Sequence, residues 1–382
     1  MKNPAKRVVT FLILFSFAGN SIAQTGGNNT YEALNFTNSA RVAALGGYAI
    51  SINDNDLNMA QYNPSLLNNA MHNHLSLNYI DYFSDIKYTS FLYSRTFQDL
   101  GSIGTGVQYI HYGTFKETDE TGTIVREFNA EDIIVNLGWG RAITPIITTP
   151  KKKELILDSM FTIGANLKFI YSSYHFDYNS LGIAVDFAGT YHNPKRNLTL
   201  AVLVKNAGVQ IKPYTSKNRE PLPFEVQMGI SKKLKHAPFR LSLTARHLEK
   251  WDLTYSDPAL VKSSLAPNAA DTLSKYKFGE KVSGFTDKLL RHGVVGVEIL
   301  LLKNFQLMFG YNYQRRKDLM LSTKKGLVGF SFGAGVKISK FHFSYGRAAY
   351  HLAGGTNHFS ITTNLSDFYT VKNRHDTPLL QE

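Results

Sequence analysis

The sequence of 382 residues contains no cysteine. A disulfide framework, a catalytic thiol and a lipid-anchored N-terminal cysteine are therefore excluded. The sequence also has no long apolar run. The segment from Val8 to Ala18 is far shorter than the about 20 residues that a transmembrane helix needs, and no later segment is long and apolar enough. We expect neither disulfides nor a membrane-spanning helix to hold this chain in place.

Residues 1–23 have the features of a secretory signal peptide. Lys2, Lys6 and Arg7 precede the apolar run, and Ser21-Ile22-Ala23 supplies the small residues of a cleavage site. The net charge of the whole chain is +13. A basic balance can indicate nucleic-acid binding, but export argues against it, and the basic residues lie mostly in separate short turns. We predict an exported chain with no nucleic acid among its partners.

Apolar residues alternate with small or polar residues along much of the sequence. From Phe161 to Tyr171 the odd positions are apolar and most even ones are small or polar, and the segment from Leu181 to Tyr191 repeats the pattern. A period of two indicates strands with one apolar face. Such segments lie at 74–83, 86–96, 102–112, 131–141, 160–171, 180–191, 198–206, 223–232, 239–249, 292–301, 304–314, 326–338, 340–350 and 356–365. The sequence thus predicts fourteen strands.

Three features favour a barrel that spans a membrane. The segments have about 9 to 12 residues, which is the length of tilted transmembrane strands, whereas soluble strands usually have about 5 or 6. Tyr and Phe crowd the strand ends, as interfacial belts require. Connections after even-numbered strands are short except for 142–159, while several after odd-numbered strands are long: 113–130, 207–222, 250–291 and 315–325.

We therefore predict an all-β fold, a 14-stranded antiparallel transmembrane β-barrel in the cell outer membrane. A closed sheet is the strand arrangement that leaves no backbone group unpaired in lipid. A soluble all-β protein is the alternative. The expected organisation is a signal peptide at 1–23, an N-terminal plug segment at 24–72, the barrel at 73–365 and a polar C-terminal tail at 366–382.

The plug is predicted because fourteen strands enclose a lumen wider than side chains can fill, the limit being about eight strands. The expected wall is polar and rich in glycine, including Gly104, Gly106, Gly138, Gly164, Gly182 and Gly296. Small residues allow close approach to it, Asp residues can meet lumen cations, and an Asn-Pro pair ends the segment. The plug residues are Arg41, Gly46, Gly47, Asp54, Asp56, Asn63 and Pro64. A periplasmic loop with solvated Asp residues is the alternative.

Catalytic and metal chemistry have little support in the sequence. His342 alternates in phase with Ser344, and His358 with Ser360, but no third orienting group can be identified. The 12 His show no HExxH spacing, and the Asp-rich stretch near Asp54 lacks the ligand spacing of a calcium loop. We expect no enzyme activity, no metal and no cofactor.

The N-terminal region resembles a known family. Gly46-Gly47, an Asp pair and Asn63-Pro64-Ser65-Leu66 ahead of a fourteen-strand pattern look like the FadL superfamily of outer-membrane barrels. Within it, three stretches resemble the barrels of the type IX secretion system: YEALNFTNSARVAALGG (31–47), ETDETG (117–122) and REPLPFEVQMGISKKLKHAPFRLSLTARHLEKWDLTY (219–255).

This resemblance implies a barrel that anchors other proteins. Its expected role is to hold PorZ at the outer membrane in the attachment complex with PorU and PorV, in contact with outer-membrane lipid and lipopolysaccharide. PorU is the sortase of that complex, and PorV is the related barrel that shuttles cargo. A FadL-like transporter of hydrophobic compounds is the alternative function, and a simple porin is a third.

Partner binding is expected on the outward loops. The longest, 250–291, contains aromatic and charged residues suited to an interface, of which we predict Trp251, Asp252, Leu253, Tyr255 and Phe285 as contacts. Trp251 suits an interfacial belt equally well. A second loop has a basic cluster that could meet lipopolysaccharide phosphates or an acidic partner, or simply form a solvated rim: Arg315, Arg316, Lys317, Lys324 and Lys325.

Overall fold

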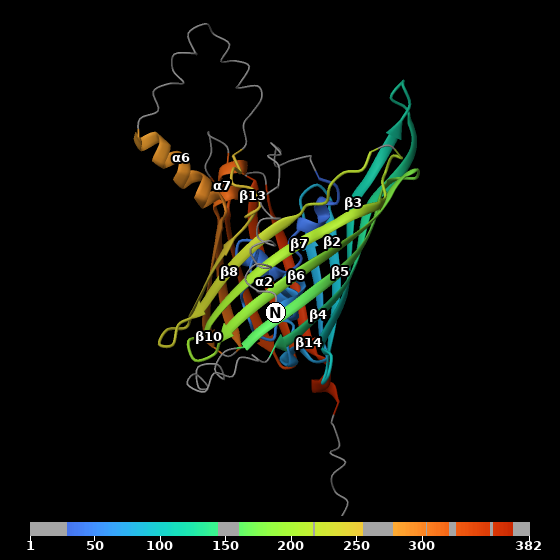
Figure 1. Ribbon diagram of the computed structural model, residues 1–382. Coiled ribbons are helices and arrows are strands. Elements are labelled where there is room, and N and C mark those ends of the chain that lie inside the picture. Colours follow the sequence, from blue (N-terminus) through green and yellow to red (C-terminus); the bar gives the residue numbers. More distant parts are fainter. Residues whose placement is uncertain are drawn as a thin grey trace, which may run out of the picture.

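A computed structural model describes residues 29–143, 160–216, 218–254, 278–302, 304–320, 326–351 and 354–369. Fourteen strands in these ranges close into a single antiparallel barrel, in which consecutive strands pair and β1 pairs with β14 (Figure 1). The predicted fold class, a 14-stranded antiparallel β-barrel, is confirmed. Within the described ranges, the model contains no helix with the length and apolar character needed to cross a membrane.

The strands are β1 (His74–Asp81), β2 (Lys87–Phe97), β3 (Gly101–Thr118), β4 (Ile124–Ile143), β5 (Met160–His175), β6 (Tyr178–Asn193), β7 (Leu198–Lys212), β8 (Glu225–Lys233), β9 (Phe239–Ala245), β10 (Gly293–Leu302), β11 (Phe305–Asn312), β12 (Phe330–Ile338), β13 (Phe341–His351) and β14 (Gly354–Asn364). The helices are η2 (Glu32–Asn35), α2 (Ala40–Ala44), α3 (Leu57–Tyr62), η3 (Pro64–Leu66), η4 (Asn69–Met71), α6 (Phe278–Arg291), α7 (Tyr313–Leu319) and η5 (Leu365–Phe368).

The strands alternate between an apolar outer face and a polar inner face. Phe169 of β5 is 48% exposed on the outside, whereas the neighbouring Lys168 is 7% exposed on the inside. Polar residues of the strands are buried on the inner face: Asn78, Gln108, Asn136, Asn166, Asp186, Gln227, Asn312 and Ser344. A closed barrel with an apolar exterior meets lipid without exposing backbone polar groups. The chain is an outer-membrane β-barrel.

The strands and connections extend further at one end of the barrel than at the other. Strands β3 and β4 pair with each other beyond His111, where β2 has ended, and they continue above the rest of the wall (Figure 1). The predicted loop 113–130 is therefore mostly strand, and the turn comes only at Asp119 to Thr123. Strand β7 likewise runs into the predicted loop 207–222 as far as Lys212. We call this end, with α6 and α7, the long-loop rim, which in such barrels is extracellular.

Several predicted strands extend past the observed strand ends, and at two of them a polar side chain redirects the backbone. Strand β11 stops at Asn312, whose side chain accepts the Arg315 N–H and begins helix α7. Strand β14 stops at Asn364, which caps η5 in the same way. Strand β9 ends at Ala245 and β12 begins only at Phe330. The predicted signal peptide, the connection 144–159 and the tail beyond 369 lie outside the described residues.

Residues 29–73, which we call the lumen segment, run inside the barrel (Figure 1). Its apolar side chains form a small core that includes Val42, Leu45 and Ile52 and packs against Met308 of the wall. Helix α2 contacts β11, β12, β13 and β14, while η3 contacts β4, β5 and β6. The segment therefore touches the wall on two sides.

Glycines in the wall let the backbone of the lumen segment come close. A Cβ on Gly164 would lie 2.3 Å from the carbonyl carbon of Pro64, and a Cβ on Gly310 would lie 2.2 Å from the Gly46 nitrogen. Most of the predicted space-making glycines face this segment, but Gly106 is packed against Leu92 of the neighbouring strand. Close packing of this kind cannot accept an added methyl group without displacement.

We predict that Gly164→Ala destabilises the barrel by about 1 to 3 kcal/mol, the usual cost of overpacking. Gly189→Ala is the matched control, because Gly189 lies opposite Ile163 in the adjoining strand and a Cβ there would meet nothing within 4 Å. Thermal unfolding of the purified variants measures the difference. Equal melting temperatures would contradict close contact between Pro64 and the wall.

Candidate functional site: the lumen segment and the outer cavity

An ionic cluster joins the lumen segment to the wall. The Arg41 guanidinium lies 2.7 Å from Asp54, 3.1 Å from Asp56 and 2.7 Å from Glu298 of β10. Arg240 of β9 lies 2.8 Å from Asp54 and 2.9 Å from the same Glu298. Asp54 thus pairs with a cation of the wall, Arg240, as predicted for the Asp residues of the segment. Asp56 pairs instead with Arg41 of its own segment.

These charges stabilise the folded arrangement only as a group. Arg41 has 5% of its side chain exposed and Glu298 has 1%, so neither can exchange its partner for water. Removing one member of such a buried pair leaves an uncompensated charge, which costs more than the pair itself contributes. The cluster therefore fixes the position of the lumen segment against β9 and β10.

The predicted Asn-Pro break is the second attachment to the wall. The Asn63 amide donates to the Ile50 carbonyl at 2.6 Å and to Thr190 of β6 at 3.2 Å. Its oxygen accepts the Ser65 N–H, so Asn63 also caps η3. Pro64 begins that turn and rests on Gly164. These contacts hold the end of the segment against β5 and β6.

The glycine pair lies between these attachments. Gly46 and Gly47 have φ values of 94° and 91°, in the left-handed region that favours glycine. The Gly46 carbonyl accepts a hydrogen bond from the Asn312 amide, and Gly47 packs under the Arg315 guanidinium. Both glycines thus position the segment next to α7.

A second polar network lies in the wall where β7 departs from regular pairing. Asn206 has a φ of 58°, and its N–H donates to the Asp186 carboxylate instead of to a strand. The Lys168 ammonium lies 2.6 Å from Asp186 and donates to the Asn206 side chain. The bulge is therefore filled with paired charges. Beyond it, the β7 ladder with β8 stops at Lys205.

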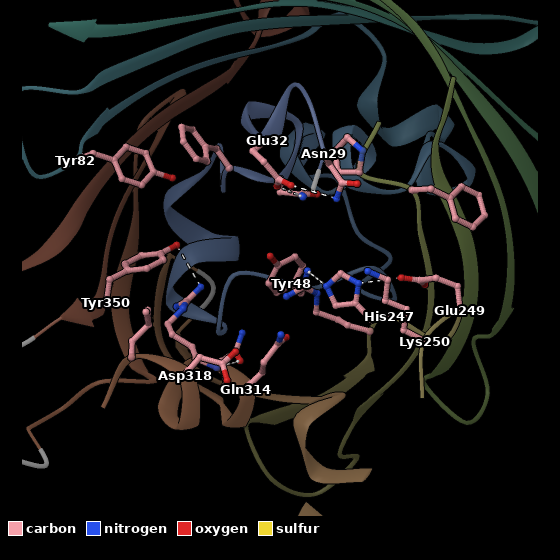
Figure 2. Close-up of a pocket in the computed structure, with 18 of the residues that line it drawn as sticks. Asn29, Glu32, Tyr48, Tyr82, His247, Glu249, Lys250, Gln314, Asp318 and Tyr350 are labelled. Atoms are coloured by element: carbon pink, nitrogen blue, oxygen red, sulfur yellow. Dashed lines mark hydrogen bonds and ion pairs between the residues drawn. The ribbon is translucent and has the colours of Figure 1, made fainter. Parts of the chain in front are cut away.

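A cavity of about 540 Å³ lies above the lumen segment at the long-loop rim. Figure 2 shows Tyr350, Gln314 and Asp318 on one side of this outer cavity and His247, Glu249 and Lys250 on another. Its aromatic lining comes from both the segment and the wall: Phe36, Tyr48, Tyr82, Phe83, Phe224 and Tyr350. The cavity can accept a group that is apolar over most of its surface.

Two buried guanidinium groups line this cavity, and their surroundings differ. Arg246 stacks on the Tyr48 ring at 3.3 Å and pairs with Glu225 at 2.8 Å. Arg315 stacks on the Tyr350 ring at 4.0 Å and donates to the Tyr350 hydroxyl at 3.2 Å. Arg315 belongs to the basic loop cluster for which lipopolysaccharide phosphates, an acidic partner and a solvated rim were open alternatives. It is 8% exposed and turned inward, which corrects the expectation of a solvated rim for this residue.

The predicted partner contacts gather partly on α6. Trp251 is 52% exposed, and its ring lies 5.3 Å from Phe285, which is 56% exposed. Asp252 pairs with Lys288 at 2.5 Å, and this hydrogen bond lowers the pKa of its carboxyl to about 2. Leu253 is only 1% exposed, so a direct partner contact there is not supported. Tyr255 lies outside the described residues.

Helix α6 is braced against α7 by ion pairs. Asp287 accepts the Tyr313 hydroxyl and lies 3.2 Å from Lys317 of α7, and it lies 2.8 Å from Arg291 of its own helix. Arg291 in turn lies 2.7 Å from Asp318 of α7. Burial disfavours the Asp287 carboxylate, but these hydrogen bonds outweigh it and lower its pKa to about 2. Lys317 of the predicted basic cluster is engaged here, and Arg316 donates to the carbonyls of Gly326 and Val328. Lys324 and Lys325 lie outside the described residues.

The His and Ser pairs considered for catalysis are arranged differently from one another. His342 lies 3.4 Å from Ser344, whereas His358 lies 2.8 Å from Thr356 instead of contacting Ser360. Among the described residues, no group of three or more His, Asp or Glu side chains is placed to hold a metal ion.

Sequence reasoning missed the wall partners of the lumen segment. Glu298 alternates in phase with Gly296, a position already assigned to the lumen, so its inward orientation could have been read from the pattern. Arg240 precedes Leu241 of the outward face and has the same signal. The meeting of Glu298 with Arg41, and of Arg240 with Asp54, could not be predicted, because it depends on the distance between strands and segment in the closed barrel.

We predict that Arg41→Met destabilises the barrel by about 3 to 5 kcal/mol, because three carboxylates lose their shared cation. Arg95→Met is the control, since Arg95 is exposed on β2, and it should change stability by no more than about 0.5 kcal/mol. Chemical denaturation of the purified barrels measures both. If adding Glu298→Gln to Arg41→Met restores part of the lost stability, the two residues are energetically coupled. An Arg41→Met variant as stable as the unaltered barrel would contradict the role of the cluster.

No protein-family model and no curated protein sequence matches this chain. Solved barrels share its general architecture. The toluene transporter TodX of Pseudomonas putida has a TM-score of 0.47 at 10% identity, over 86% of this chain and 96% of that one. The toluene transporter TbuX of Ralstonia pickettii has 0.45 at 9%, over 87% and 99%. A Pseudomonas aeruginosa FadL homologue has 0.43 at 9%, over 86% and 98%.

Proposed function

We propose that this chain is a PorQ-type barrel of the type IX secretion system, which anchors PorZ in the attachment complex with PorU and PorV. The observation that carries the proposal is the filled lumen, in which a buried Arg41 cluster and the Asn63 contacts hold residues 29–73 against the wall. A barrel filled in this way serves better as a rigid membrane body than as a channel. In this proposal the lumen segment is a plug.

The stretches of sequence that resemble type IX barrels support a role at the cell surface. ETDETG, residues 117–122, forms the tip of the β3–β4 hairpin, which rises above the rest of the rim (Figure 1). The stretch 219–255 runs through β8 and β9 and leads to Trp251. Both reach the side on which an extracellular partner would bind.

Exposed apolar groups on the same rim supply a binding surface. Trp251, Phe285 and Leu289 are 52%, 56% and 51% exposed. The ion pairs between α6 and α7 fix their position relative to the barrel. Aromatic residues held rigidly at a surface are favoured as anchors in protein interfaces. We assign them the contact with PorZ, and the lipid and lipopolysaccharide contacts to the wall and the remaining rim.

We predict that the double variant Trp251→Ala with Phe285→Ala weakens PorZ capture by about tenfold or more, as expected for loss of hot-spot aromatics. Leu100→Ala is a matched control, because Leu100 is 58% exposed but lies in the turn between β2 and β3 at the opposite rim. Pull-down from detergent extracts measures recovery. Full recovery with the double variant would exclude this surface. Failure of the unaltered barrel to recover PorZ would contradict the anchoring function itself.

A FadL-like transporter of hydrophobic compounds is the second candidate. The outer cavity has an aromatic lining, and the ladder between β7 and β8 ends at Lys205, next to the bulge at Asn206. Against passage through the wall, paired charges of Lys168 and Asp186 fill that bulge. The anchor therefore agrees better with the geometry.

Planar bilayers and uptake assays separate the two functions. We predict that the full barrel shows no stable conductance, and that deletion of residues 29–72 opens a conducting pore, because the wide lumen then loses its filling. Cells with the barrel should take up toluene no faster than cells without it. Faster uptake that depends on the barrel would favour the transporter, and stable conductance of the full barrel would favour a porin.

A further inference from the structure

Arg315 is a buried cation of the lumen side that has no carboxylate partner among the described residues. Its counterparts all have one: Arg41, Lys168, Lys205, Arg240 and Arg246. Arg315 is 8% exposed, its Nη2 donates to the Tyr350 hydroxyl, and its Nη1 has no hydrogen-bond partner within the described part of the chain. A buried charge without a partner is costly, so its retention points to a ligand that supplies the missing charge.

We propose that the outer cavity binds a carboxylate side chain on a peptide segment of a partner protein, with Arg315 as its receptor. This inference rests on the proposed anchoring function, since it identifies where and how a partner inserts. Guanidinium groups bind carboxylates through two parallel hydrogen bonds, which gives both strength and orientation. The stacking of Arg315 on Tyr350 holds the guanidinium plane in place before the ligand arrives.

The charges around the cavity favour one carboxylate over a polyanion. The lining contains three basic and three acidic side chains: Arg246, Lys250 and Arg315, with Glu32, Glu249 and Asp318. Arg246 is already neutralised by Glu225. A phosphate-rich lipopolysaccharide core would therefore meet three carboxylates and no positive charge in excess. A single acidic side chain needs only Arg315.

The surroundings also define what lies beside that carboxylate. The barrel wall encircles the cavity, so a ligand enters along the barrel axis from the aqueous side of the long-loop rim (Figure 2). Phe36, Tyr82 and Phe224 are aromatic residues of the cavity lining. We assign the site to a loop or chain end with one Asp or Glu next to apolar residues.

The position of the receptor depends on the lumen segment. Asn312 caps the helix that carries Arg315 and donates to the Gly46 carbonyl, while Gly47 lies directly beside the guanidinium. A side chain at Gly47 would meet Arg315 Nη2 at 2.9 Å. The segment that fills the barrel therefore also shapes the floor of the proposed binding site.

The test uses the purified full barrel in detergent and a blocked tripeptide, acetyl-Phe-Asp-Leu-amide, with acetyl-Phe-Asn-Leu-amide as its neutral twin. Calorimetric titration should give about 10- to 100-fold tighter binding of the acidic peptide, which is the worth of a hydrogen bond to a charged group. Arg315→Met should remove the preference, and Arg315→Lys should recover part of it. Arg316→Met, in the same helix but outside the cavity lining, should keep it.

Stability measurements separate loss of binding from loss of folding. Arg315→Met should melt at the same temperature as the unaltered barrel or higher, because it removes an unpaired buried charge. Equal affinity for the two peptides, or a preference that survives Arg315→Met, would overturn the proposal. Acetate binding as tightly as the acidic peptide would overturn the peptide assignment. PorZ capture that is unchanged by Arg315→Met would refute the insertion while leaving the anchoring function intact.

Discussion

Every backbone amide and carbonyl at membrane depth must find its hydrogen bond within the protein, because lipid offers none. In this chain that requirement is met by pairing β1 with β14, which closes the sheet and leaves no edge. Closure with fourteen strands fixes a wide interior, and a wide polar interior must be filled with water or with protein. The lumen segment, the glycines that receive it and the buried ion pairs all follow from this one constraint.

Filling the lumen with protein creates an electrostatic problem that the chain solves in two ways. Where Arg41 meets the wall, carboxylates from both the segment and β10 surround it, and the charges stabilise one another. Where β7 bulges, Asp186 takes an orphaned backbone N–H and pairs with Lys168. Both networks convert breaks in regular structure into fixed attachments. The lumen segment and the bulge are therefore held by buried charge pairs below the rim.

The long-loop rim, in contrast, contains exposed apolar groups and an unpaired buried charge. Its apolar side chains on α6 are exposed above the membrane, and its buried Arg315 lacks the counter-charge that every other buried cation of the described lumen has. These features would destabilise an isolated protein, and they are understandable if a partner covers the first and neutralises the second. The closed lower half and the incomplete upper half together agree with the proposed anchoring function.

The sequence by itself determined the strands, because alternation with a period of two is a local signal that Phe161 to Tyr171 or Leu181 to Tyr191 display without reference to any neighbour. It also predicted which residues face inward, and it marked Asp54, Asn63 and the glycines as belonging together. It failed at the ends of strands: β3 and β4 continue past the predicted loop boundary because they pair with each other, and Asn312 ends a strand by capping a helix. The partners of Arg41 and the isolation of Arg315 emerged only in the closed barrel, because an ion pair depends on distances across the lumen that no local pattern encodes.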